Sequence, residues 1–267
     1  MGKITQGITG PHTGTIGPVT TYMLNDQNVT RAKGRSDKPF TEAQLNNQLQ
    51  MKVIGDFFNA VEEFVTVGFT PISRGSNCYP QNLFIKYNKP DALTGYIPNV
   101  TVNCAKALLS YGNLPQPKNA KVELLEEGIK FSWDATEEVS WPRNRDQVMM
   151  MAYFPEIDEA IFETSGVKEI KGSDILPLHE HYKENVMELY IAFNADDRSD
   201  VSTSLYLGKI DPANGPELIL PAELEKKTVE TAEQKVFDIA RNLKSMGLSA
   251  DDIAKATGLT LKIVEDL

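Results

Sequence analysis

Two of the three histidines in this chain stand close enough in sequence to share a metal ion. His179 and His181, in the stretch LHEHYKE, are two residues apart, so an extended backbone would place both imidazoles on one side. A zinc site needs three or four ligands, and the third histidine, His12, is remote in the sequence. The pattern favours a polar strand edge or loop here, and the sequence predicts no metal and no cofactor.

Acidic pairs are the other residues that could do chemistry. They occur at Glu62-Glu63, Glu126-Glu127 and Glu137-Glu138. General acid–base catalysis needs two carboxylates that converge on one substrate atom, whereas neighbours on a strand point to opposite faces. The chain also lacks a GxSxG, a P-loop, a GxGxxG that opens a helix and an HExxH. We therefore expect no catalytic residues and no enzymatic activity.

A loop with the sequence EEVSWPRNRDQ holds the residue types that dominate protein contacts. Trp141, Arg143 and Arg145 lie there between two predicted strands, and tryptophan and arginine are enriched in binding hot spots. Because the end loops of a sandwich are common binding surfaces, this loop is a predicted contact surface. The alternative is that Trp141 folds back and caps the core.

The C-terminal residues follow the pattern of short helices joined by tight turns. Ser249 is placed to cap a helix that ends near Gly258, and Thr260 opens a very short one. A recognition helix must present basic or amide side chains to base edges, but this one offers Lys262 beside Glu265 and Asp266. The pattern therefore favours a docking or oligomerisation element over DNA binding.

The composition is that of an ordinary globular protein. Of the 267 residues, 41% are apolar and 24% charged, and the formal net charge is −10. This acidic balance argues against a surface that broadly binds nucleic acid or an anionic membrane. No signal peptide or membrane span is recognisable, and two cysteines are too few for a disulfide scaffold. We expect a cytoplasmic or virion location and free thiols.

Residues 1–40 differ from the rest of the chain because glycines interrupt a run of threonine, isoleucine and valine. Pro11 and Pro18 lack backbone donors, so we expect an extended glycine-rich arm rather than a central strand. The alternative is a disordered tail. If the arm adds strands to a partner, the contact candidates are Ile4, Ile8, Val19 and Tyr22.

The remainder predicts a mainly β protein with some α-helix. Residues 41–117 combine a long helix, which opens with the capping box TEAQ and ends near Gly68, with a β-rich segment. Short alternating runs over 118–210, including the hairpin KVELLEEGIKFSW, predict an immunoglobulin-like or fibronectin-like β-sandwich. A proline-rich connector, 211–230, then leads to a small helical tail, 231–267.

Several motifs occur together in a recognisable order: GTIGPV, KPFTEAQL, YNKPDALTGYIPNV, FSWD, DQVMMMAYFPEIDEAIF and STSLYLG. In this order they resemble an uncharacterised family, a domain of unknown function common in Bacteroidota and their phages, over about residues 1–209. The resemblance implies a fold and a phage setting but supplies no catalytic residues. The tail resembles the helical tail of transposase-like nucleases.

Together these features predict a non-enzymatic structural or assembly protein. Its partners would be further copies of the chain or other subunits of an assembly, plausibly a phage or prophage virion. One alternative is a nucleic-acid-associated protein that uses the basic residues 31–38 and the tail. Another is a ligand-binding or glycan-binding module on the sandwich loops.

Overall fold

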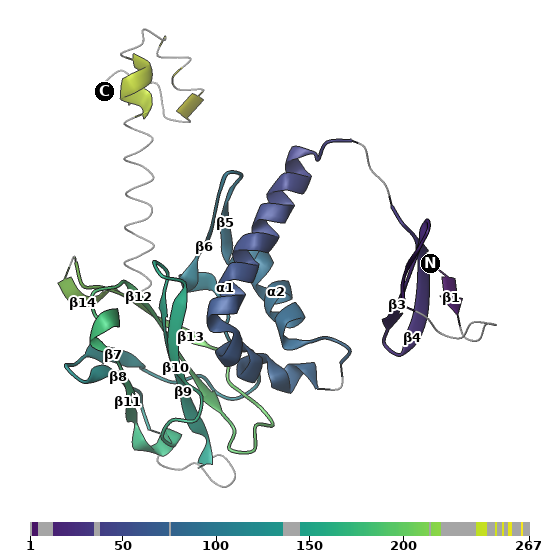
Figure 1. Cartoon of the computed structure of the whole chain (residues 1–267). Coiled ribbons are helices and arrows are strands. Elements are labelled where there is room, and N and C mark those ends of the chain that lie inside the picture. Colours follow the sequence, from purple (N-terminus) through teal and green to yellow (C-terminus); the bar gives the residue numbers. More distant parts are fainter. Residues whose placement is uncertain are drawn as a thin grey trace.

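The protein is a mixed α/β chain with antiparallel sheets and one long helix (Figure 1). In the body of the protein, two helices cover one face of a five-stranded sheet, and a three-stranded sheet covers the other. A computed structural model describes most of the chain. It describes residues 2–4, 13–34, 38–74, 76–135, 145–213 and 215–219, with 239–244, 249, 253, 256, 257 and 263 of the C-terminal segment.

The long helix α1, Glu42–Ser73, begins as predicted. The amide of Gln44 donates to Thr41 Oγ1 at 3.4 Å, and the Thr41 amide donates to Gln44 Oε1 at 2.9 Å, so the capping box is formed. The helix continues past Gly68, which the sequence analysis took as its end. A Cβ at Gly68 would lie 2.5 Å from the carbonyl oxygen of Leu109, so this glycine allows close packing and does not end the helix.

Helix α2, Pro80–Asp91, corrects the prediction of a strand in this segment. Pro80 occupies the first helical turn, where a missing amide donor costs nothing. Leu83, Phe84 and Asn88 are buried at helical spacing, and the ring of Phe84 packs against phenylalanine rings of α1. The short run NLFI is compatible with the apolar spacing of a helix and with that of a strand. Packing against α1 favours the helix.

The five-stranded sheet has the order β10-β9-β12-β13-β14. Strands β9 and β12 are buried on both faces, which explains why QVMMMAYF and MELYIAF are almost continuously apolar. Met149, Met151 and Tyr153 face the helices, whereas Met150 and Ala152 face the other sheet. The strands are β9 Gln147–Phe154, β10 Glu159–Glu163, β12 Met187–Asn194, β13 Leu205–Asp211 and β14 Gly215–Ile219.

The three-stranded sheet has the order β11-β8-β7, and its hairpin β7–β8 is the one the sequence predicted. Phe131 and Trp133 pack from this side against the five-stranded sheet. The Trp133 indole donates to the carbonyl of Glu169 at 2.8 Å. Two antiparallel sheets thus share a core, while the immunoglobulin-like type remains a prediction. The strands are β7 Lys121–Leu124, β8 Gly128–Ser132 and β11 Ser173–Pro177.

The hairpin of β5, Leu93–Tyr96, and β6, Asn99–Val102, lies along α1 (Figure 1). Asn46 of α1 accepts a hydrogen bond from the Ile97 amide at 3.0 Å in the hairpin turn. After β6 a short 3₁₀ turn, Cys104–Lys106, leads the chain back beneath the helices. This segment brings Cys104 against the helix-facing side of the five-stranded sheet.

The N-terminal strands form a sheet of their own, in the order β1-β4-β3-β2. The prediction of an extended arm rather than a central strand is therefore wrong for residues 14–32, because β3 and β4 are the central strands of this sheet. Asn25 and Asp26 have φ angles of 48° and 58°, and these two residues make the tight turn between β3 and β4. Figure 1 shows this sheet separated from the body of the protein. The strands are β1 Gly2–Ile4, β2 Gly14–Ile16, β3 Val19–Leu24 and β4 Gln27–Ala32.

The predicted proline-rich connector, 211–230, contains a strand near its beginning. Strand β14, Gly215–Ile219, pairs with β13 and extends the five-stranded sheet past the expected boundary at 210. Residues 220–238 and most of the predicted helical tail lie outside the described residues. Within the tail, the Ile253 amide donates to the Ser249 carbonyl at 3.0 Å, a helical hydrogen bond where the sequence places a helix.

Candidate functional site

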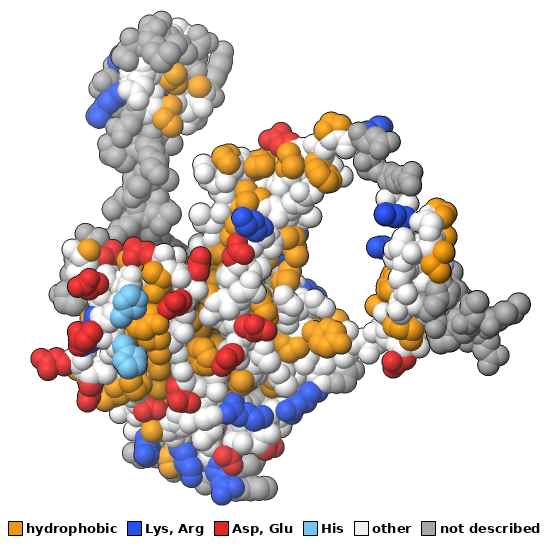
Figure 2. Space-filling model, viewed as in Figure 1, with side chains coloured by type: hydrophobic (Ala, Val, Ile, Leu, Met, Phe, Trp, Pro, Cys, Tyr) orange, Lys and Arg blue, Asp and Glu red, His pale blue; other side chains and the backbone are white. Residues whose placement is uncertain are grey.

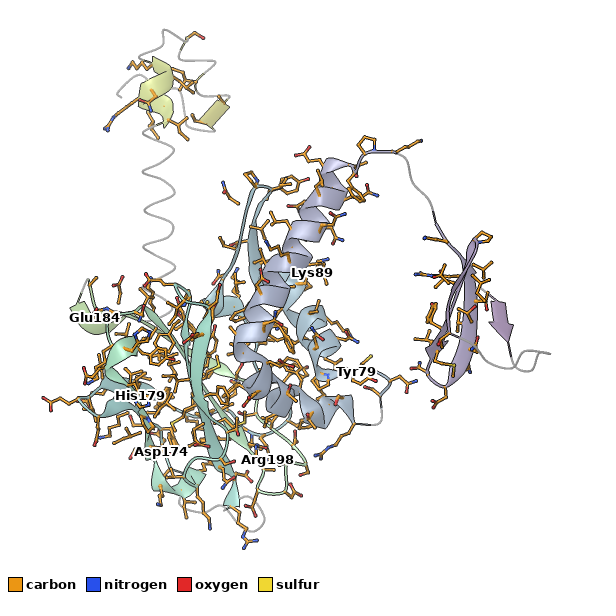
Figure 3. The ribbon with its side chains drawn as sticks, viewed as in Figure 1. Tyr79, Lys89, Asp174, His179, Glu184 and Arg198 are labelled. Carbon is orange, nitrogen blue, oxygen red and sulfur yellow. The ribbon has the colours of Figure 1, made fainter. Side chains whose placement is uncertain are left out.

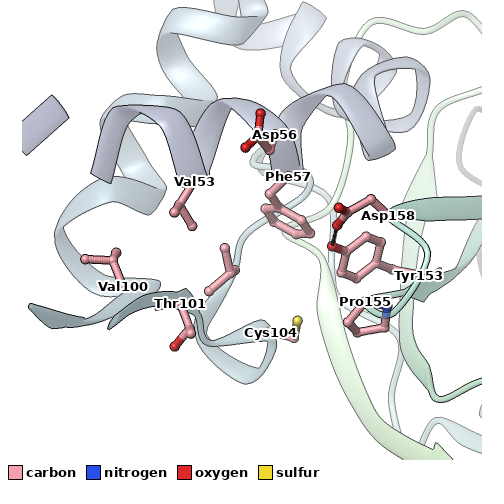
Figure 4. Close-up of a pocket in the computed structure, with 10 residues that line it drawn as sticks. Val53, Asp56, Phe57, Val100, Thr101, Cys104, Tyr153, Pro155 and Asp158 are labelled. Carbon is pink, nitrogen blue, oxygen red and sulfur yellow. Dashed lines mark hydrogen bonds between the residues drawn. The ribbon is translucent and has the colours of Figure 1, made fainter. Parts of the chain in front are cut away.

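A hollow in the described body lies between α1, β6 and the turn that joins β9 to β10 (Figure 4). We call it the α1–β6 pocket; its volume is about 330 Å³. Sites for small ligands commonly have volumes of this order and mostly apolar walls with a few polar groups. The walls consist of Val53, Asp56, Phe57, Val100, Thr101, Val102, Cys104, Tyr153, Pro155 and Asp158.

Helical and strand periodicity together position the pocket walls. Val53, Asp56 and Phe57 are spaced by three and four residues, so they share one face of α1. Phe57 meets Tyr153 of β9 edge-to-face, with ring centroids 5.0 Å apart. The Tyr153 hydroxyl donates to Asp158 Oδ1 at 3.1 Å, which ties the turn after β9 to the aromatic wall.

Two exposed carboxylates give the pocket its electrostatic character. Asp56 comes from α1 and Asp158 from the β9–β10 turn, where it has a φ of 52°. Among the described residues, Asp56 has neither a hydrogen-bond nor an ion-pair partner. Two carboxylates beside an aromatic wall suit a cationic group with an apolar stem, such as a lysine or arginine side chain.

Cys104 contributes a thiol to the pocket wall. Burial, reinforced by the Glu188 carboxylate, raises the pKa of its thiol to about 12. The Tyr190 hydroxyl donates to the Cys104 carbonyl at 2.6 Å and fixes the backbone at this position. Because the thiolate is the nucleophilic form, Cys104 is unreactive at neutral pH.

A buried carboxyl group lies behind the pocket. Glu188 of β12 accepts a hydrogen bond from the Tyr206 hydroxyl at 2.5 Å, and Lys209 is its cross-strand neighbour on β13. Burial raises the pKa of Glu188, while the bond from Tyr206 and the charge of Lys209 partly oppose the shift. The raised pKa marks a carboxylate that folding desolvates.

Glu188→Gln is expected to stabilise the fold increasingly as the pH rises. With a folded-state pKa above the unfolded one, the Glu188 carboxyl stabilises the native state fully below about pH 4.3, and this contribution is lost as the pH rises through the folded-state value. The glutamine amide does not titrate and its oxygen still accepts from Tyr206. Chemical denaturation of both proteins between about pH 4 and pH 7 measures the difference. A difference that stays constant with pH would contradict the assignment.

The contact residues predicted from sequence do not come together at this pocket. Arg145 precedes β9 and lies 3.6 Å from the Asp196 carboxylate, in an exposed ion pair of little energetic weight. Trp141 and Arg143 lie outside the described residues, as does Ile8. Ile4, Val19 and Tyr22 belong to the N-terminal sheet, where the Arg31 guanidinium lies 5.6 Å from the Tyr22 ring centroid.

The histidine pair does not belong to the walls of the α1–β6 pocket. His179 and Glu184 are on the side away from α2 (Figure 3), and His181 belongs to the short 3₁₀ turn Glu180–Tyr182 rather than to an extended strand. Within the described part of the chain, no three potential ligands among His, Cys, Asp and Glu gather to hold a metal. His12 lies outside it.

The pocket residues were not predicted as a site because only the tertiary structure brings them together. The alternation of Met149, Met151 and Tyr153 could have placed Tyr153 on the helix-facing side of β9. Nothing in the sequence links Asp56 to Asp158, which are about a hundred residues apart and on different elements.

Comparison with known proteins identifies a family for this chain but gives no activity for it. Residues 12–208 match a family described as being of unknown function (DUF6266). No curated protein and no solved structure matches the chain. In the part of the chain that the structure describes, no helix is both long and apolar enough to cross a membrane.

Proposed function

The chain belongs to a family of unknown function (DUF6266), and we propose that it is a non-enzymatic assembly protein that acts through protein–protein contacts. The observation that carries this proposal is the apolar surface of the N-terminal sheet. Ile16, Met23 and Leu24 are 69%, 48% and 49% exposed on strands β2 and β3. Met23 and Leu24 are neighbours on β3 and point to opposite faces, so this small sheet exposes apolar side chains on both faces, which supports an interaction role.

The free end of α1 supplies a second apolar surface. Phe40, Leu45 and Met51 are exposed there, and Tyr96 of the β5–β6 hairpin is exposed beside them. Figure 2 shows hydrophobic side chains gathered over this end of the helix and along the N-terminal sheet. Two such surfaces on one chain support a contact between copies.

We also propose that the two packed sheets form an immunoglobulin-like or fibronectin-like sandwich. If strands β7 to β13 are lettered A, B, C, C′, E, F and G, with the letter D left unused, the two sheets have the orders A-B-E and C′-C-F-G, and β14 lies next to G. This order supports an immunoglobulin-related or fibronectin-related sandwich, an architecture common in docking domains.

The setting we propose is a phage or prophage-derived particle. Only the resemblance to a phage-associated family supports it, and mass spectrometry of purified particles from a producing strain is the direct test. The nucleic-acid-associated and glycan-binding alternatives remain predictions from the sequence.

Replacing the exposed apolar residues of the N-terminal sheet is expected to weaken self-association more than tenfold. The triple variant Ile16→Thr, Met23→Thr, Leu24→Thr keeps residues that suit strands but removes about 1 kcal/mol or more of apolar contact per site. Sedimentation velocity over a concentration series measures the change. Deletion of residues 2–30 should abolish association and leave the body folded.

Ile170→Thr is the matched control, because Ile170 is 49% exposed on the body and lies outside both surfaces. It should associate like the unmodified protein. If the triple variant and the deletion both assemble normally, the N-terminal sheet is not the contact surface and the proposal is wrong.

A further inference from the structure

The N-terminal 40 residues of this chain carry a net positive charge, whereas the rest of the chain is acidic. Residues 1–40 contain five basic and two acidic side chains, a net charge of +3, which leaves −13 for residues 41–267 out of the total of −10. Arg31 and Lys33, at the end of β4, are exposed. The Lys33 amide donates to the Pro18 carbonyl at 2.7 Å, so these basic residues are held to the N-terminal sheet.

The α1–β6 pocket has the complementary chemistry. Its aromatic wall, Phe57 and Tyr153, can receive the apolar stem or the cation of a basic side chain, and Asp56 and Asp158 can neutralise the charge. The volume of about 330 Å³ accommodates one such side chain. Asp56 has no partner among the described residues, so binding would not have to break an existing ion pair.

We propose that the α1–β6 pocket receives Arg31 or Lys33 from a second copy of this chain. The inference rests on the proposed assembly function and specifies its contact: the basic end of one N-terminal sheet docks on the acidic pocket of the next body. Such a contact closes into a two-fold dimer when each copy docks its segment on the pocket of the other, and otherwise it generates a ring or an open chain.

A charge-reversal exchange in the full-length chain tests this contact. One variant carries Asp56→Lys and Asp158→Lys, and the other carries Arg31→Glu and Lys33→Glu. Each variant alone should lose at least tenfold in self-association by sedimentation velocity, because attraction becomes repulsion. An equimolar mixture should recover association, since the reversed pocket of one variant meets the reversed segment of the other.

Glu62→Lys with Glu63→Lys is the matched control, because both residues are exposed on α1 and lie outside the pocket. This variant should associate like the unmodified chain. Because Asp158 accepts a bond from Tyr153, Asp56→Lys alone provides a second pocket variant, and thermal unfolding checks that each protein is folded. Self-association of the unmodified chain should also weaken between about 0.05 M and about 0.5 M salt.

The outcomes separate the two proposals. A full-length chain that stays monomeric at all concentrations would overturn the assembly function and this contact together. Association that persists in both pocket variants would overturn the contact alone. Loss in the pocket variants without loss in the Arg31/Lys33 variant would assign the pocket to a different basic partner and also refute the contact, as would a mixture that fails to re-associate.

Discussion

Replacing Phe84 by alanine is expected to lower the free energy of unfolding by about 3–5 kcal/mol. Phe84 is fully buried at the centre of the helical layer, where its ring centroid lies 5.9 Å from that of Phe57, 5.6 Å from Phe58 and 6.1 Å from Phe69. Truncation removes the side chain that joins α2 to α1 and leaves a cavity among three aromatic rings. Chemical denaturation measures the loss.

Phe40→Ala is the matched control for this substitution. Phe40 is 61% exposed just before α1, so its truncation should change the free energy of unfolding by no more than about 0.5 kcal/mol. A Phe84→Ala variant as stable as the control would mean that α2 does not pack on α1 as described. A loss of this size is a large fraction of the stability of a typical domain.

The helix α1 and the hairpin β7–β8 were predictable because their signals are local. The capping box at Thr41 and the alternation of Ile129, Phe131 and Trp133 each identify the element without knowledge of its neighbours. Gly68 shows the limit of this reasoning. Its role is to let the segment at Leu109 approach the helix. Such a close approach between distant segments cannot be predicted from a single sequence.

Helix α2 and the N-terminal sheet were missed for two different reasons. In α2 the short run NLFI fits a buried strand and a buried helix equally well, and only packing against α1 decides between them. In the N-terminal sheet a local signal was present, because Asn25-Asp26 is a suitable pair for a two-residue turn with positive φ. The glycines near this hairpin favoured the prediction of an extended arm instead.

The candidate site depends on a contact that sequence reasoning cannot supply. Asp56 and Tyr153 reach the pocket through periodicity on α1 and β9, but Cys104 reaches it because the loop after β6 is held in place. A buried asparagine holds the end of that loop. Asn88 of α2 donates to the Leu108 carbonyl at 2.8 Å and accepts from the Leu108 amide at 2.7 Å.

Asn88→Ala is therefore expected to destabilise the protein by roughly 2–6 kcal/mol. Asn88 is fully buried, and its truncation leaves the amide and the carbonyl of Leu108 without these partners, at about 1–3 kcal/mol for each unsatisfied group. The loop that contains Cys104 should loosen as well, which hydrogen exchange at the Leu108 amide would report as a loss of protection.

Asn82→Ala is the matched control, because Asn82 lies on the same helix but is exposed. It should leave both the free energy of unfolding and the exchange at Leu108 nearly unchanged. Unchanged protection at Leu108 in Asn88→Ala would show that Asn88 does not hold the loop. If protection is lost while α1 and β9 exchange as before, the side chain acts locally, and Asn88 is the residue through which α2 positions one wall of the pocket.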